Sequence, residues 1–308
     1  MTMVRTSPWP WPAFTAVGKH PARVMLDAVS GLPVLGWEAS CRFSTRGIQT
    51  GRLLAGIDRE ALSASRWGTL FDELGVPTSY LPDIEQDLGS ANRIYVACEQ
   101  GSNSVTRKVY LEFAHAARQR SGERLSILGY KWTAGEAASA HRRITEYWTQ
   151  ERTDARTAMA GLQFGSGVSK GGALALLADV LIHALTEALV LAGSDSLWQH
   201  EFIRVSETST TRASFAFNFY GSGLLVDDLV QAVTALAKEW ELNTHETHQL
   251  LDAIAQRELA WLAGGLDAQG ELFLTIYCVA SCEDAIHACF AADPTLHDAL
   301  LSTAGGNA

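Results

Sequence analysis

Polar and apolar side chains alternate with a period of two along several segments of this chain, a pattern that predicts β-strands. The clearest case is residues 92–113, where two alternating arms flank Gly-Ser-Asn-Ser, a sequence that favours a turn. In the second arm one face is apolar, and the other carries Lys108, Tyr110 and Glu112. A cation, a phenol and a carboxylate in line indicate the inner wall of a polar cavity, although a solvated sheet face also explains them.

The same alternation predicts strands at residues 34–43, 47–54, 124–132, 202–207, 213–220, 259–264 and 272–279. Apolar residues spaced by three and four positions predict helices at residues 22–29, 67–74, 81–88, 136–148, 173–191, 229–240 and 248–256. The order of strand, helix pair and hairpin occurs over 34–113 and again over 213–279. The two copies share little sequence, so this is a repeat of architecture.

Antiparallel strands with helices between them favour a mixed fold of helices and strands, α/β (α+β). In this fold a closed antiparallel β-barrel lies inside an outer ring of helices. We expect a single domain over residues 1–308. Within it, residues 1–20 are expected to form an irregular N-terminal arm, and residues 302–308 a flexible tail.

Composition places the chain among globular proteins and excludes some functions. Of its 308 residues, 47% are hydrophobic and 19% are charged, which is ordinary for a globular protein. The formal net charge of −10 argues against a nucleic-acid partner, because binding a phosphate backbone needs a basic face. A small anionic ligand stays compatible with it, because such a ligand responds to the local field. Prolines and tryptophans at residues 9–12 interrupt the apolar core that a signal peptide needs, so we expect a cytoplasmic protein.

The five cysteines are too few and too irregularly spaced for a disulfide scaffold in a chain of this length. Residues 278–289 contain a C-x₃-C-x₄-H-x-C pattern with zinc-ligand residue types. The spacing is poor for one metal ion, because His287 and Cys289 would diverge on a helix. Buried apolar cysteines are therefore the favoured interpretation.

The long apolar helix predicted at residues 173–191 carries Asp179, His183 and Glu187 on one face. These side chains argue against a membrane span, and a polar stripe toward water is favoured over a metal site. The glycine-rich residues 165–172 before this helix could cradle a phosphate. They do not match the phosphate-loop pattern, so a linker is favoured.

The sequences Trp37-Glu-Ala-Ser-Cys-Arg-Phe43 and Ile48-Gln-Thr-Gly-Arg-Leu53 resemble the peptide prenyltransferases of cyanobactin pathways. These enzymes are ABBA-barrel prenyltransferases, in which antiparallel strands enclose a reaction chamber inside a ring of helices. Residues 107–113, the strand opened by Arg212, and residues 262–277 also resemble family strands. The chain departs from the family in a longer region over 120–198 and in lacking the family's last strand, a gap that residues 124–132 would fill.

The resemblance implies transfer of a C5 or C10 allylic group from its diphosphate to a side chain of a ribosomally made peptide, or to a related aromatic or guanidine acceptor. Glu38 would act as the base that takes the acceptor's proton. Mg²⁺ would accompany the diphosphate rather than occupy a protein cage. The residues expected to bind the diphosphate and shield the cation are Arg52, Lys108, Tyr110, Arg212 and Tyr277.

Other interpretations of these residues stay open at this point. Glu38 and Arg42 also fit an ion pair on a strand surface, and Arg52 fits a solvated turn residue. A non-catalytic binding or scaffold protein of a biosynthetic cluster could keep the barrel without the chemistry. A protein that binds a metal through the Cys/His pattern is a third interpretation.

Overall fold

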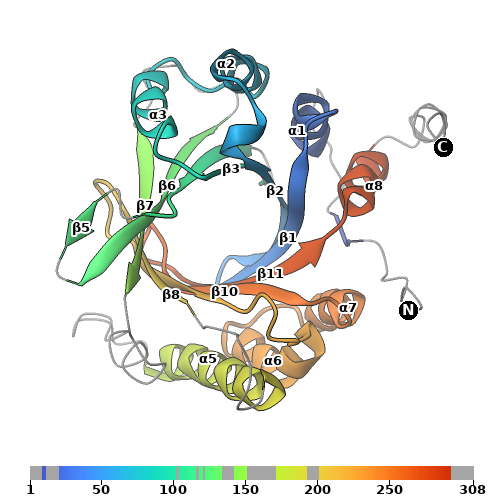
Figure 1. The fold of residues 1–308 in the computed structure, drawn as a ribbon. Helices are drawn as coiled ribbons and strands as arrows, with labels where there is room; N and C mark the ends of the chain where they lie inside the picture. Colours follow the sequence, from blue (N-terminus) through green and yellow to red (C-terminus); the bar gives the residue numbers. More distant parts are fainter. Residues whose placement is uncertain are drawn as a thin grey trace.

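The alternating segments form strands that pair antiparallel, and all but β4 and β11 pair with the next strand along the chain. A computed structural model describes residues 9–11, 21–101, 104–115, 118–120, 122–133, 142–150, 171–192 and 201–292. β4 pairs with β6 and β11 with β1, so the sheet closes into the predicted barrel (Figure 1). β5 (Gln119–Arg120) only extends the edge of β6. The ten barrel strands are β1 (Val34–Ser44), β2 (Gly47–Asp58), β3 (Arg93–Gln100), β4 (Val105–Glu112), β6 (Glu123–Thr133), β7 (Arg143–Gln150), β8 (Phe202–Glu207), β9 (Ala213–Asn218), β10 (Leu259–Leu266) and β11 (Leu272–Ala280).

The seam between the first and the last strand is regular. β1 and β11 pair from Trp37 with Ala280 to Ser44 with Phe273 without a shift in register. The described strands therefore close the barrel by themselves. β6 continues the wall between β4 and β7, as expected for residues 124–132.

The helix predicted over residues 136–148 is wrong, because β7 occupies the second part of that range. Residues 134–141 lie outside the described residues. In β7, Ile144 and Trp148 pack against the outer core, while Thr145 and Tyr147 face the barrel interior. Over the eight residues of β7 a period of two is hard to distinguish from a helical period, and the β-branched and aromatic residues decide for a strand.

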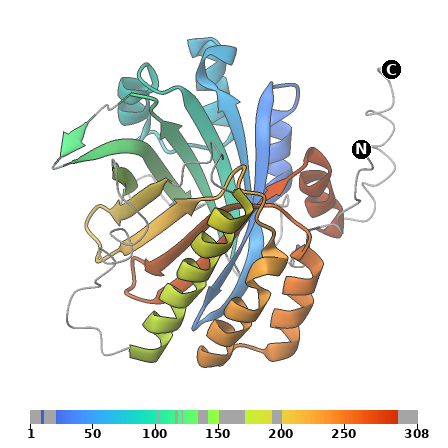
Figure 2. The same ribbon diagram turned by 60° about the horizontal axis from the view of Figure 1, so that its bottom comes forward.

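Helices cover the outside of the barrel (Figure 1). Figure 2 shows α5, α6 and α7 side by side over one side of it. The helices are α1 (Pro21–Val29), α2 (Ala64–Glu73), α3 (Leu81–Leu88), α5 (Gly171–Ala192), α6 (Val230–Glu239), α7 (Thr244–Ile254) and α8 (Cys282–Ala292), with 3₁₀ turns η1 (Arg59–Ala61) and η2 (Val226–Leu229). The hairpin β1–β2, the pair α2–α3 and the hairpin β3–β4 recur as β8–β9, α6–α7 and β10–β11, which confirms the predicted repeat.

The hydrophobic core lies between the barrel and its helices. Outward side chains such as Leu53 and Ile94 pack on α1, α2 and α3 around Trp67. Those of β1, β9, β10 and β11, such as Phe217 and Ile276, pack on α5, α6 and α7. Burial of apolar area stabilises the fold by about 25 cal/mol per Å², so this register commits the alternate, polar residues of each strand to the barrel interior.

Part of the expected N-terminal arm lies against the body of the protein. Trp9 is 2% exposed, and its indole Nε1 donates a hydrogen bond of 3.0 Å to the carbonyl oxygen of Thr50. The guanidinium of Arg257 lies 5.4 Å from the centre of the Trp9 ring. The tail at 302–308 and the glycine-rich residues 165–170 lie outside the described residues.

The predicted burial of the cysteines in the Cys/His pattern is confirmed for Cys278 and wrong for Cys282. Cys278 is buried on the outer face of β11, whereas Cys282 is exposed. His183 on α5 hydrogen bonds through Nε2 to the carbonyl oxygen of Asp228 at 2.7 Å. Within the described ranges, no group of three or more His, Cys, Asp or Glu residues is placed to hold a metal ion. Among the same residues, no helix has the length and apolar character needed to cross a membrane.

The pairing of β10 with β9 depends on Gly265, which has a φ of +119°. A Cβ atom there would lie 2.5 Å from the carbonyl oxygen of Ala213. We expect Gly265→Ala to lower the free energy of unfolding by about 3 kcal/mol, from backbone strain and overpacking together. Gly47→Ala is the matched control, because Gly47 has a φ of +124° but would place its Cβ in open space. Urea unfolding measures both; equal losses would show that the close approach carries no cost.

Candidate active site

The inward faces of the strands enclose a cavity of about 890 Å³, a size typical of small-molecule sites. All six side chains singled out in the sequence line this cavity: Glu38, Arg52, Lys108, Tyr110, Arg212 and Tyr277. Arg52 and Lys108 are each 7% exposed, so Arg52 is not the solvated turn residue of the alternative interpretation. Lys108, Tyr110 and Glu112 face the cavity together, so their face of the sheet is not a solvated outer surface.

The pairing register sorts the cavity residues into layers along the barrel axis. On β1, Glu38 faces inward toward one end of the barrel and Arg42 toward the other. Their Cα atoms are about 13 Å apart along the strand, because each strand residue advances the chain by about 3.3 Å. The alternative interpretation of Glu38 and Arg42 as an ion pair is therefore wrong, and Arg42 instead contacts Asp267 through Nη2 at 2.6 Å.

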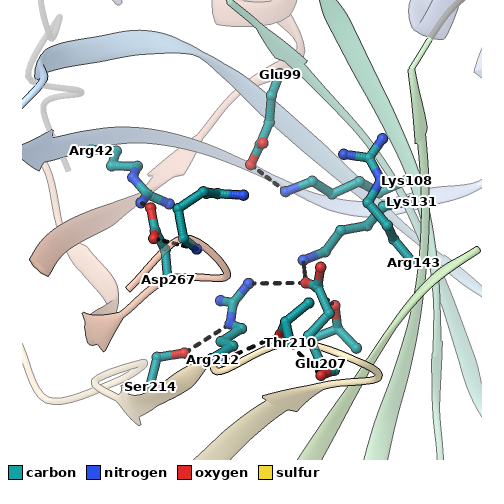
Figure 3. A network of polar contacts seen from close by, with 12 residues as sticks. Arg42, Glu99, Lys108, Lys131, Arg143, Glu207, Thr210, Arg212, Ser214 and Asp267 are labelled. Atoms are coloured by element: carbon teal, nitrogen blue, oxygen red, sulfur yellow. Dashed lines mark hydrogen bonds and ion pairs between the residues drawn. The ribbon is translucent and has the colours of Figure 1, made fainter. Parts of the chain in front are cut away.

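The Arg42 end of the cavity is a cation layer, in which lysines and arginines from distant strands surround three carboxylates (Figure 3). Its cations are Arg42, Arg52, Lys108, Lys131, Arg143 and Arg212, and its carboxylates are Glu99, Glu207 and Asp267. These six cations and three carboxylates leave an excess of about three positive charges when all are ionised. The excess matches the charge of a diphosphate ester, close to three negative charges.

Glu99 and Glu207 each bridge two cations of this layer. Glu99 accepts a contact of 2.5 Å from Arg52 Nη2 and a hydrogen bond from the Lys108 ammonium. Glu207 Oε2 lies 2.7 Å from Lys131 Nζ and 3.5 Å from Arg212 Nη1. The carboxylates hold the cations in place before any ligand arrives, and this limits the reorganisation that anion binding needs.

Asp267 holds the third part of the layer from the turn between β10 and β11. Its Oδ2 binds Arg42 at 2.6 Å and Arg46 at 2.7 Å, while Oδ1 accepts the backbone N–H groups of Gln269 and Glu271 at 2.9 and 3.0 Å. These N–H groups and the two arginines lower the pKa of the Asp267 carboxyl, although burial acts in the opposite direction. The loop carboxylate therefore stays ionised and fixes the Arg42 side chain.

Burial lowers the pKa of the Lys108 ammonium to about 8, although Glu99 acts in the opposite direction. Burial together with Arg212 and Lys108 also lowers the pKa of Lys131. The three carboxylates do not neutralise all the positive charge of these buried, crowded cations, so the layer is short of negative charge. An arriving polyanion would supply that charge.

Tyr110, Tyr147 and Tyr277 form a tyrosine layer next to the cations. The ring of Tyr110 lies flat over Gly129, where a Cβ would be 2.8 Å from its Cε1, and meets the Tyr147 ring edge-on at 5.9 Å. Burial raises the pKa of Tyr110 and raises that of Tyr147 to about 12. The hydroxyls of Tyr110 and Tyr147 therefore stay protonated at neutral pH and can donate hydrogen bonds.

Glu38 lies beyond the tyrosines, at the opposite end from the cations, in an acid layer with Glu112. The hydroxyl of Tyr220 donates a hydrogen bond of 2.5 Å to Glu38 Oε1, and Tyr95 donates one to Glu112. Burial raises the pKa of the Glu38 carboxyl to about 7; the Tyr220 hydrogen bond acts against this shift, and Glu112 adds to it. A carboxyl with this pKa can exchange a proton near neutral pH.

An apolar wall lines the cavity between these layers. Its small side chains come from β8, β9 and β10, and aromatic rings flank them. The wall consists of Ile203, Val205, Ala216, Ala263, Tyr147, Trp261 and Tyr277. Such a surface accommodates a hydrocarbon chain or an aromatic ring, while the charged layers at its two ends fix polar groups.

Several cavity residues escaped the sequence analysis. Glu99 and Lys131 lie on predicted strands and share the inward parity of Tyr95 and Gly129, so alternation alone could have located them. Tyr147 was missed because its segment was assigned to a helix. The pairing of Asp267 with Arg42 joins residues 225 positions apart, and no local pattern indicates it.

Comparison with known proteins supports the fold. No protein-family model and no curated protein matches the chain. Among solved structures, it is similar to a 6-dimethylallyltryptophan synthase from Micromonospora olivasterospora in complex with DMASPP and Trp, at 13% identity and a TM-score of 0.51, over 83% of this chain and 82% of that one. AnaPT from Neosartorya fischeri gives 11% identity and a TM-score of 0.48, over 79% and 78%. NotF in complex with brevianamide F and DMSPP gives 12% and 0.48, over 87% and 82%.

The first of these likenesses, together with the closed ten-stranded antiparallel barrel, identifies the fold as the ABBA barrel of the prenyltransferases. The predicted fold class is therefore confirmed. At 13% identity the likeness concerns the fold, and the chemistry must be argued from the cavity residues themselves.

Inorganic pyrophosphate is the simplest probe of the cation layer. We expect Lys131→Met to weaken its binding about 10- to 100-fold, because a charge-assisted hydrogen bond contributes about 1.5–3 kcal/mol. Glu207 keeps Thr145 and Arg212 as partners in this variant. Titration calorimetry at pH 7 measures the affinity. Arg46→Ala is the control, because the Arg46 side chain is 57% exposed and contacts Asp267 from outside the cavity; equal effects of the two variants would contradict a specific layer.

Proposed function

We propose that the protein is a prenyltransferase that moves a C5 or C10 allylic group from its diphosphate to an acceptor. The observation that carries the proposal is the order of the layers within one cavity: excess cations, then buried tyrosines and an apolar wall, then a carboxyl with a pKa near 7. Each layer suits one stage of the reaction. The fold neighbour with a TM-score of 0.51 is by name a dimethylallyltryptophan synthase, which agrees with this chemistry.

The donor diphosphate would bind in the cation layer, against Arg52, Lys108 and Arg212. Ionisation breaks the allylic C–O bond, and the electron pair stays with the diphosphate. Fixed cations stabilise the negative charge that develops on the leaving group, and they act strongly because they are buried and already in place. Arg52 keeps its charge throughout, since Glu99 raises its pKa and outweighs the opposing effect of burial.

The allylic cation would lie against the tyrosine layer. Each aromatic face stabilises a nearby cation by about 1–2 kcal/mol when water is excluded. The ring centres of Tyr110 and Tyr147 are 5.9 Å apart and the rings are nearly perpendicular, so the two ring faces point in different directions. Both hydroxyls stay protonated, because burial raises their pKa values, and a neutral phenol is a weaker nucleophile toward the allylic cation than a phenolate.

The acceptor would enter from the Glu38 end, with its apolar part on the wall that includes Trp261. Attack on the allylic carbon forms the new bond and leaves one excess proton on the acceptor, which Glu38 takes. We propose a side chain of a ribosomally made peptide, or a related small aromatic or guanidine molecule, as the acceptor. An N–H or aromatic nucleophile matches a carboxylate base beside an apolar surface.

The cation layer fits a diphosphate without a protein cage for a metal. Glu99, Glu207 and Asp267 are each engaged by lysine or arginine side chains. We therefore propose that Mg²⁺ is held by the diphosphate oxygens, where it would supply further charge neutralisation when bound. The residues Arg52, Lys108 and Arg212 bind and orient the donor in either case.

Replacing Glu38 separates chemistry from donor binding. We expect Glu38→Gln to lower kcat by about 10²- to 10⁴-fold, because it removes the general base, while the Kd of DMASPP stays unchanged. Arg52→Ala should do the reverse and raise the donor Kd and KM. Mass spectrometry of acceptor peptides and calorimetry with DMASPP provide the two readouts. Glu38→Gln protein with wild-type turnover would refute the base. A wild-type protein that binds DMASPP, the unreactive thiolo analogue of the donor, but transfers no prenyl group from dimethylallyl or geranyl diphosphate would favour a non-catalytic binding protein.

The pH dependence follows from two groups. Glu38 must be ionised to accept a proton, and its pKa is raised to about 7, so kcat/KM should rise as the pH passes through 7. Lys108 must be protonated to bind the donor, and its pKa is lowered to about 8, so kcat/KM should fall as the pH rises above 8. The bound diphosphate stabilises the ammonium, so the alkaline limb of kcat should lie at higher pH. A flat profile of kcat/KM between pH 6 and 9 would contradict both assignments.

A further inference from the structure

Glu38 differs from the other carboxylates of the cavity in its partners. The other five each lie within 4.0 Å of a lysine or arginine nitrogen; they are Glu99, Glu112, Glu201, Glu207 and Asp267. Within the described part of the chain, Glu38 has no ion-pair partner, and its one side-chain hydrogen bond comes from the hydroxyl of Tyr220 at 2.5 Å. The orientation of Glu38 therefore depends on Tyr220.

The turn after β9 fixes the position of Tyr220. Phe219 and Leu224 are fully buried on either side of it, and the backbone N–H of Tyr220 donates to Asn218 Oδ1 at 2.9 Å. Gly221 adopts a φ of +76°, which allows the chain to reverse directly after the tyrosine. The Tyr220 residue is 41% exposed, yet its hydroxyl points back to a carboxylate 182 positions earlier in the chain.

We propose that Tyr220 is a positioning residue for Glu38, whose hydroxyl holds Oε1 and leaves Oε2 free to take the acceptor's proton. This inference rests on the proposed role of Glu38 as the base. The hydroxyl does not contact the donor end of the cavity, where the cation layer lies. Its loss should therefore affect the proton transfer and not the binding of the diphosphate.

The hydrogen bond also sets the proton affinity of Glu38. A donor hydroxyl stabilises the carboxylate form, so removing it favours the protonated form. The other titratable groups that act on Glu38 or on Tyr220 are Glu112 from β4, Tyr95 from β3, Cys278 from β11 and Glu258, which precedes β10. None of these carries a positive charge. Arg93 on β3 also lines the cavity, but it contacts Glu112 at 4.0 Å and hydrogen bonds to Tyr95. Among the described residues no ion pair joins Arg93 to Glu38, so it does not replace the lost hydrogen bond.

The test uses Tyr220→Phe in the full chain. We expect the acidic limb of kcat/KM to move up by about one pH unit, as the loss of a hydrogen bond to a charged group implies. We expect kcat at pH 7 to fall about fivefold, because a rise of about one unit from a pKa of about 7 lowers the ionised fraction of Glu38 from about one half to about one eleventh. The Kd of DMASPP should stay unchanged. Tyr95→Phe is the matched control, because it removes the phenol that binds Glu112 at the same end, and it should not move the acidic limb up.

A second readout is independent of turnover. In protein labelled with ¹³C at the glutamate carboxyl carbons, the signal missing from Glu38→Gln identifies Glu38, and its titration gives the pKa directly. An upward shift in Tyr220→Phe supports the proposal; an unchanged titration in that variant, or an equal shift in Tyr95→Phe, would overturn it. A shifted titration with no prenyl transfer by the wild type would overturn the proposed function while supporting the Tyr220–Glu38 contact.

Discussion

The structure depends on the direction in which each strand turns its apolar face. The apolar residues of the barrel strands point outward onto the helices, so the polar residues are committed to the interior. The β1–β11 seam closes the sheet without an edge, and the charged interior becomes a chamber. Buried charges are costly unless they are paired, and this explains why Glu99, Glu207 and Asp267 accompany the cations.

The same arrangement creates a polarity along the barrel axis. The cation layer lies at the Arg42 end, while Glu38 and Glu112 lie at the other end with phenols as hydrogen-bond donors. Arg93 pairs with Glu112 at that end. A spacing of about 13 Å between the ends of this axis follows from the strand geometry. For the proposed transfer, this spacing would put the leaving group and the proton acceptor on opposite sides of the reacting carbon, with tyrosines between them. The described strands hold these groups in place before a ligand binds.

The barrel and the main site residues were accessible from sequence because they follow local alternation. Lys108, Tyr110 and Glu112 share one face in the sequence pattern and in the structure. The contacts that organise the site were not accessible, because the Arg42–Asp267 and Tyr220–Glu38 pairs join residues far apart in the chain. The helix predicted over 136–148 hid the inward direction of Tyr147, because side chains follow a period of 3.6 on a helix and a period of two on a strand.

The central claim is that one chamber binds a diphosphate at one end and holds the base, Glu38, at the other. A crystal structure of the protein with DMASPP bound tests it most directly. The account predicts the diphosphate among Arg52, Lys108 and Lys131, with the allylic group against Tyr110 and Tyr147 and facing Glu38. Diphosphate density outside the barrel, or an allylic group turned away from the tyrosines, would contradict it.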